Sequence, residues 1–146
     1  MSLFKKAAPE IYEAMSEAET QVKAFDIEPK LKELIKIRAS QINGCGYCID
    51  LHTRDARAIG ESEQRIYALS AWWETPFFTE KEQLVLRLTE AVTQISEEGV
   101  PEELREEAIK MLGEQGFAHV VFTIITINSW NRLAIPSHLM PEPETL

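Results

Sequence analysis

The chain has 146 residues, of which 45% are hydrophobic and 27% are charged, a balance that fits one soluble globular domain and excludes a disordered chain. Its 24 Asp and Glu against 15 Lys and Arg give a net charge of −9, which argues against binding to nucleic acid or to an anionic membrane surface, since both attract basic patches. A domain of this size buries roughly 68–70% of its unfolded surface, so its two cysteines are not needed as disulfide staples.

Proline, glycine and apolar residues recur at helical positions along the sequence, a pattern that predicts an all-α chain of about six to seven helices. A first helix is expected over residues 9–25, and a second over residues 29–43, where the turn-forming pair Asn43–Gly44 ends it. A third helix is expected from Cys45 to Gly60. The predicted apolar stripe of the first helix comprises Ile11, Met15, Ala18, Val22 and Phe25.

The second half of the chain continues the helical pattern. Ser62 is expected to cap a short helix that ends before Pro76, because the residue before a proline avoids the α region. Residues 79–82, Thr-Glu-Lys-Glu, are predicted to form a capping box at the start of the next helix. A further helix is expected over residues 101–112. The β-branched segment 117–134 is predicted to be the last helix, since no partner strand is evident.

Neither export nor a membrane span is predicted. Residues 1–15 carry two lysines but no uninterrupted apolar region of the length that a secretory signal needs. No window approaches the ~18 consecutive apolar residues of a membrane span, because polar residues interrupt even the most apolar stretch, 117–127. We therefore expect a cytoplasmic protein. In that compartment thiols are kept reduced, and paired cysteines are more often catalytic or metal-binding than structural.

Residues 43–52 gather the chemically active side chains of the chain. Cys45, Cys48 and His52 lie at positions i, i+3 and i+7, so a helix that starts at Cys45 places all three on one face. In the first turn of a helix, unpaired amides and the helix dipole favour the thiolate. A thiolate attacks a peroxide to give a sulfenic acid, and a second cysteine converts it to a disulfide. His52 has the position of a base for this chemistry.

Three other uses of the cysteines remain open. A zinc site would have Cys45, Cys48 and His52 as ligands but no clear fourth, since His119 and His138 are distant in sequence. The cysteines could also be small core residues. A thioredoxin-type site would need a βαβ context, which the helical pattern lacks. The pattern favours thiol redox chemistry over all three.

The spacing resembles that of a known family. The motif E-x11-C-x-x-C-x3-H, which begins at Glu33 and ends at His52, is the signature of the alkylhydroperoxidase D-like (AhpD-like) branch of the carboxymuconolactone decarboxylase family. All four anchor positions match. The resemblance is strongest over residues 31–60 and extends to residues 72–73, 79–82 and 127–132.

The resemblance implies an all-helical AhpD-like domain over residues 1–146, with its core at about 9–135, that forms homotrimers or homohexamers and reduces hydroperoxides. By position, Cys48 would attack the peroxide and Cys45 would resolve the sulfenic acid, while His52 and Glu33 would form the relay that activates Cys48. No cofactor or metal is implied. The reductant would be a dithiol, carried by a lipoyl or thioredoxin-like protein.

One position departs from the pattern of the best-known enzyme of this type, which has a histidine directly before the second cysteine. Here that residue is Tyr47, a poorer proton shuttle at neutral pH. The departure leaves open a thiol-disulfide reductase with little peroxidase activity, or a non-catalytic oligomeric protein of the same family. A lactone decarboxylase fits poorly, because the founding decarboxylases lack the paired cysteines. Residues 130–132 are assigned no chemistry.

Overall fold

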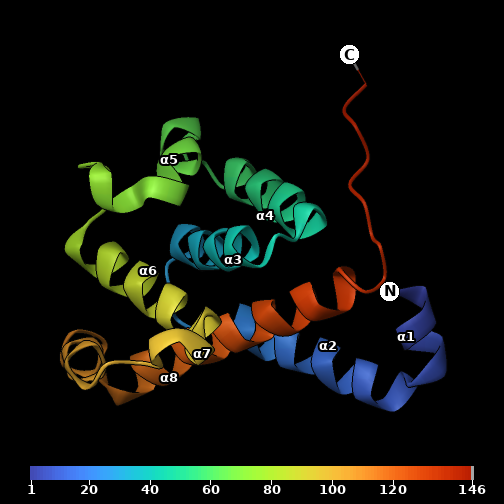
Figure 1. The fold of residues 1–146 in the computed structure, drawn as a ribbon, viewed down its shortest axis with the longest axis horizontal. Helices are drawn as coiled ribbons and strands as arrows, with labels where there is room; N and C mark the ends of the chain where they lie inside the picture. The colour runs from blue at the N-terminus through green and yellow to red at the C-terminus, as the bar shows by residue number, and fades with distance from the viewer. Residues whose placement is uncertain (146) are drawn as a thin grey trace.

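The computed structural model describes residues 1–145 and confirms the predicted all-α class, with no strand in that range (Figure 1). Among these residues no helix is both long enough and apolar enough to cross a membrane. The elements in chain order are α1 (Ser2–Ala7), α2 (Pro9–Lys23), α3 (Pro29–Asn43), α4 (Gly46–Ala58), α5 (Glu63–Ala68), the 3-10 helix Leu69–Glu74, α6 (Glu80–Thr93), α7 (Ile95–Glu98) and α8 (Glu102–Ala134).

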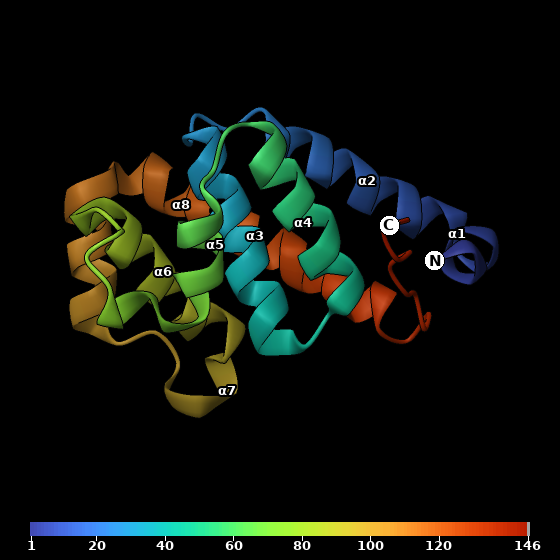
Figure 2. The same ribbon diagram turned by 90° about the horizontal axis from the view of Figure 1, so that it is seen from above.

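Helix α3 lies at the centre of the molecule and is covered on two sides (Figures 1 and 2). Leu31 and Ile35 pack in one cluster with residues of α6 and α8, whereas Leu34 and Ile37 pack in a second cluster with residues of α4, α5 and the 3-10 helix. These four side chains are at most 2% exposed. Burial of each side chain contributes roughly 1.5–3 kcal/mol to stability. The two clusters therefore fix the position of α3, and with it the position of the α3 side chains that belong to neither cluster.

The helix ends that carry local sequence signals lie where the sequence predicts them. Helix α3 covers the expected range and ends at Gly44, whose φ of 71° is left-handed and suits glycine. Ser62 caps α5 through a hydrogen bond from the Arg65 amide. The capping box of α6 is complete, since Thr79 Oγ1 accepts from the Glu82 amide at 3.2 Å and Glu82 Oε1 accepts from the Thr79 amide at 2.9 Å.

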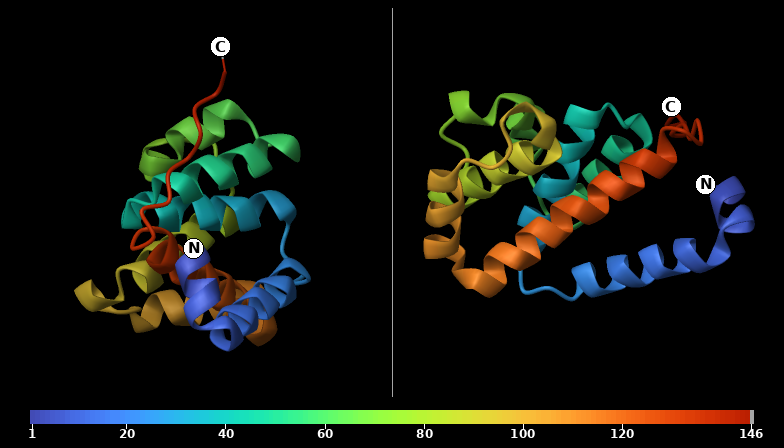
Figure 3. Two further views of the ribbon diagram at one scale, coloured as in Figure 1. Left: turned by 90° about the vertical axis from the view of Figure 1, so that its right-hand side faces the viewer. Right: turned by 60° about the horizontal axis from the view of Figure 1, so that its bottom comes forward.

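Three features differ from the prediction. The short helices α1 and α7 were not expected, and α8 runs through the segment predicted to separate two helices. Its backbone is non-helical only at Gly113, with φ 74° and ψ 167°, and the helix changes direction in its first half (Figure 3). The predicted apolar stripe of the first helix is only partly buried, because Val22 is 3% exposed but Ile11 is 63% exposed. Helix α2 instead turns Tyr12 toward Trp130 of α8, with ring centroids 5.8 Å apart.

Candidate active site

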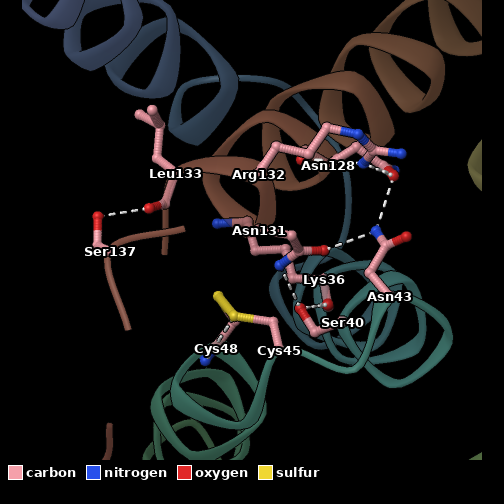
Figure 4. The surroundings of a disulfide bond; sticks show 10 residues. All are labelled: Lys36, Ser40, Asn43, Cys45, Cys48, Asn128, Asn131, Arg132, Leu133 and Ser137. Atoms are coloured by element: carbon pink, nitrogen blue, oxygen red, sulfur yellow. Dashed lines mark hydrogen bonds between the residues drawn. A yellow bond between two sulfur atoms is a disulfide. The ribbon is translucent and has the colours of Figure 1, made fainter. Parts of the chain in front are cut away.

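The two cysteines lie where α4 begins, beside the end of α8 (Figure 4). Cys45 is the N-cap residue, and its Sγ accepts a hydrogen bond from the Cys48 amide at 3.4 Å. A disulfide joins the two residues, whose Cα atoms are 5.3 Å apart. The predicted third helix is therefore confirmed, except that Cys45 caps it and Gly46 is its first residue. This position places both sulfurs at the positive end of the helix.

A pocket of about 710 Å³ opens on one side of the disulfide. Cys48 lines this pocket, whereas Cys45 is absent from its lining and is 2% exposed. Cys45 packs in a small cluster with Cys48 and Ala134 of α8. A molecule in the pocket would therefore reach the sulfur of Cys48, with Cys45 directly behind it.

Glu33 and His52 meet at the same pocket from different helices. Glu33 Oε2 on α3 is 3.0 Å from His52 Nδ1 on α4, and their side chains are 14% and 12% exposed. Both residues line the pocket with Cys48. Because the carboxylate engages Nδ1, Nε2 is the ring nitrogen that can exchange a proton with a molecule in the pocket. The structure thus brings together the four residues selected from the sequence, including Glu33, which would otherwise be taken for a solvated carboxylate.

Sequence reasoning missed a buried ion pair beside these residues. Lys36 Nζ lies 3.1 Å from Glu19 Oε1 and 3.9 Å from Glu33 Oε1, and the lysine is 4% exposed. The Trp130 indole donates to Glu19 Oε2 at 3.2 Å. These contacts join α2, α3 and α8 around the pocket. The spacing of Glu33 and Lys36 on one helix was visible in the sequence, but nothing local could show that residues 19 and 130 meet there.

A buried amide network holds α8 against the turn that precedes Cys45 (Figure 4). Asn131 is fully buried, and its Nδ2 donates to Ser40 Oγ at 3.0 Å. Asn43 Nδ2 donates to Asn131 Oδ1 at 2.9 Å and to Asn128 Oδ1 at 2.8 Å. The Cys45 amide in turn donates to the Ser40 carbonyl at 3.0 Å. Asn131, which was assigned no chemistry from the sequence, and Asn128 therefore support the cysteine turn.

The side chains that could hold a metal ion are not the set considered from the sequence. Glu33, His52 and Asp55 each offer one ligand atom, and these atoms lie within 4.8 Å of one another. Two carboxylates and an imidazole are ligand types that zinc accepts. Cys45 and Cys48 are joined to each other, so neither is available as a thiolate ligand in this state.

Sequence comparison identifies the family. A model of the carboxymuconolactone decarboxylase family matches residues 9–91, more than half of the chain. The chain belongs to this family. The uncharacterized protein YdfG of Bacillus subtilis is 44% identical over 132 residues, which are 90% of each chain. The uncharacterized YnjA of Escherichia coli is 25% identical over 71 residues, 49% of this chain and 39% of that protein.

Solved structures agree with this membership. A crystal structure from Agrobacterium tumefaciens, of a protein of unknown function proposed to be the antioxidant defence protein AhpD, matches with a TM-score of 0.91 and 36% identity over 97% of both chains. The debrominase Bmp8 matches with a TM-score of 0.84 and 20% identity over 96% of this chain and 75% of its own. At that identity Bmp8 supports the fold alone. The predicted membership of the carboxymuconolactone decarboxylase family is therefore confirmed.

Proposed function

We propose that the protein is an antioxidant thiol peroxidase that reduces hydroperoxides through a dithiol–disulfide cycle of Cys45 and Cys48. The observation that carries the proposal is the shared pocket, which Cys48, His52 and Glu33 line together while Cys45 lies behind Cys48 within disulfide distance. The Agrobacterium relative, itself proposed to be an antioxidant defence protein, supports the same class of activity.

The cycle begins with both cysteines reduced. His52 accepts the proton of Cys48, directly or through a water, while Glu33 holds the imidazole at Nδ1. The thiolate attacks a peroxide oxygen, so that an S–O bond forms, the O–O bond breaks, and the departing alkoxide takes a proton from His52 to leave as an alcohol. The Cys45 thiol then attacks the sulfenic acid of Cys48, which releases water and forms the disulfide. An external dithiol reduces that disulfide and becomes oxidised itself.

The setting of the enzyme is part of the same proposal. The reductant is a lipoyl or thioredoxin-like dithiol protein, and the enzyme acts in the cytoplasm as a homotrimer or homohexamer without a metal or organic cofactor. A second candidate function is a thiol-disulfide reductase with little peroxidase activity. The observation that favours it is Tyr47, which lines the pocket next to Cys48 where a histidine would be the better proton shuttle.

The test is hydroperoxide consumption by the purified protein with a small dithiol as the reductant. Cys48→Ser should abolish turnover, and Cys45→Ser, mixed with hydroperoxide in the absence of the dithiol, should consume one equivalent and leave a sulfenic acid on Cys48. Wild-type turnover in Cys48→Ser would overturn the assignment. Fast reduction of a disulfide substrate together with negligible peroxide turnover would favour the reductase instead.

A further inference from the structure

Lys32 presents a positive charge to the pocket beside Cys48 without a carboxylate partner. The residue is 9% exposed and lines the pocket. Its Nζ donates to the backbone carbonyl of Lys23 at 2.8 Å, and no Asp or Glu oxygen within residues 1–145 lies closer to it than 4.0 Å. A buried ammonium group without a counter-ion is unfavourable, and an anion bound beside Nζ would offset that cost.

The other buried charges around the pocket already have partners. Lys36 is paired with Glu19, and Glu33 is held by His52. The remaining charged groups of the lining are the terminal ammonium of Met1, which is partly exposed, and the side chains of Lys23 and Asp55, which are exposed to solvent. Lys32 is therefore the buried cation of this lining that has no carboxylate partner, and it could pair with an anion that enters the pocket. Because carboxylates of the protein also line the pocket, a singly charged anion fits better than a doubly charged one.

The rest of the lining suits an apolar or aromatic body. Tyr12 and Trp130 meet edge to face, and the pocket is also lined by Leu51 and Ala58 of α4 and by Ile59 at its C-cap. The volume of about 710 Å³ lies in the range of sites for organic ligands. Hydrogen peroxide, close in size to a water molecule of about 30 Å³, would leave most of this space unfilled.

We propose that the pocket binds an amphipathic organic monocarboxylate, whose carboxylate pairs with Lys32 and whose apolar body contacts Tyr12 and Trp130. The substrates of this class are alkyl or aryl hydroperoxides that also carry a carboxylate group. This substrate assignment rests on the proposed peroxidase function, whereas the binding of the carboxylate does not. Lys32 is then a specificity-determining residue that takes no part in the chemical steps.

Binding is measured by calorimetry on the disulfide form, with octanoate and 1-octanol as probes. Octanoate should bind wild-type protein about tenfold or more tightly than 1-octanol, as expected for a hydrogen bond between charged groups. Lys32→Met keeps the aliphatic stem but should abolish this preference, and Lys32→Arg should retain it. Lys30→Met, an equal charge change at an exposed residue of the same helix, should also retain it.

Two results overturn the inference. One is a wild-type protein that binds octanoate no more tightly than 1-octanol, a measurement that does not depend on the folding of any variant. The other is a folded Lys32→Met variant that retains the preference.

Turnover separates this inference from the proposed function. Wild-type kcat/KM should be about tenfold higher for a carboxylate-bearing alkyl hydroperoxide than for its methyl ester, mainly because KM is lower for the acid. In Lys32→Met, the kcat/KM values of acid and ester should be equal. Equal wild-type turnover of acid and ester would overturn the substrate assignment and leave the peroxidase function intact. If neither compound is turned over while octanoate binding depends on Lys32, the peroxidase proposal fails and the carboxylate site stands.

Discussion

Glu33 is held between two cationic or ionisable side chains at the pocket. One carboxylate oxygen lies 3.0 Å from His52 Nδ1, and the other lies 3.9 Å from Lys36 Nζ. Contacts from both sides fix the carboxylate, and the carboxylate fixes the orientation of the imidazole. In the proposed cycle Glu33 is therefore a positioning residue that acts through His52.

Replacing Glu33 with Gln keeps the side-chain volume but removes its charge and its hold on the imidazole. We expect Glu33→Gln to lower kcat/KM for hydroperoxide about 10- to 100-fold, since oriented bases contribute on that scale. Glu107→Gln, which removes an exposed carboxylate paired with Arg87, is the matched control and should leave kcat/KM unchanged.

A double-mutant cycle decides whether Glu33 works through the histidine. In a His52→Ala background, Glu33→Gln should have little further effect, because the group that it orients is gone. Equal losses in both backgrounds would mean that Glu33 acts independently of His52.

A site residue could be predicted from the sequence when its partners lie within a few positions of it, and not when the contact depends on how two helices pack. Cys48 and His52 lie on one short helix that Cys45 caps, so local spacing alone brings these three residues together. The contact of Glu33 with His52 required the family motif, because two helices must pack to create it. Glu19 and Trp130 are separated by 111 positions. Their contact depends on how α2 and α8 cross, and no short sequence pattern predicts the crossing of these two helices.

At the scale of elements, local capping signals were reliable and packing faces were not. The ends of α3 and α6 follow from Gly44 and from the capping box, which are contacts within a few residues. Periodicity placed Val22 correctly on the buried side of α2 but not Ile11, because the length of α2 that is covered depends on the direction of α8 after the break at Gly113. A helix that is covered along only part of its length leaves the rest of its apolar stripe exposed, as Ile11 shows.

The start of α6 carries a buried charge cluster that should make stability sensitive to acid. Arg65 makes an ion pair with Glu82 and a second one with Glu61, which is 2% exposed. Burial raises the pKa of Glu82, but the hydrogen bonds from Arg65 and from the Thr79 amide together outweigh it, so the pKa lies below the usual 4.5. The folded state therefore favours the carboxylate form of Glu82.

This lowered pKa fixes the sign of the pH effect. The stabilisation from Glu82 is fully present above the unfolded value of 4.5 and is lost as pH falls through the lower folded value. The free energy of unfolding, measured by urea denaturation from pH 7 down to pH 3, should fall more steeply below pH 4.5 for wild type than for Glu82→Gln. Glu103→Gln, at an exposed position of α8, should keep the wild-type slope. Parallel curves for wild type and Glu82→Gln would refute the assignment.

At the scale of the whole molecule, α8 has an apolar face on each side. Ile124 and Ile127 are at most 1% exposed and belong to the side that faces the helical core, whereas Phe122 and Ile125 are 56% and 46% exposed. Phe122 and Ile125 lie three positions apart, so they share the outer face of the helix. Two large apolar side chains exposed side by side fit a surface that a second copy of the chain covers in the proposed homo-oligomer.

Phe122→Glu should disrupt that contact, because a charge buried between subunits without a partner is strongly unfavourable. We expect sedimentation equilibrium to give a trimer or hexamer mass for wild type and a monomer mass for Phe122→Glu. Tyr67→Glu, an equally large change at a side chain of α5 that is 74% exposed, should keep the wild-type mass. A monomeric wild type would refute the oligomer, and an unchanged mass for a folded Phe122→Glu would place the contact on another face. Because α8 also carries Trp130 and Asn131, octanoate affinity of the monomeric variant would then report whether assembly supports the pocket.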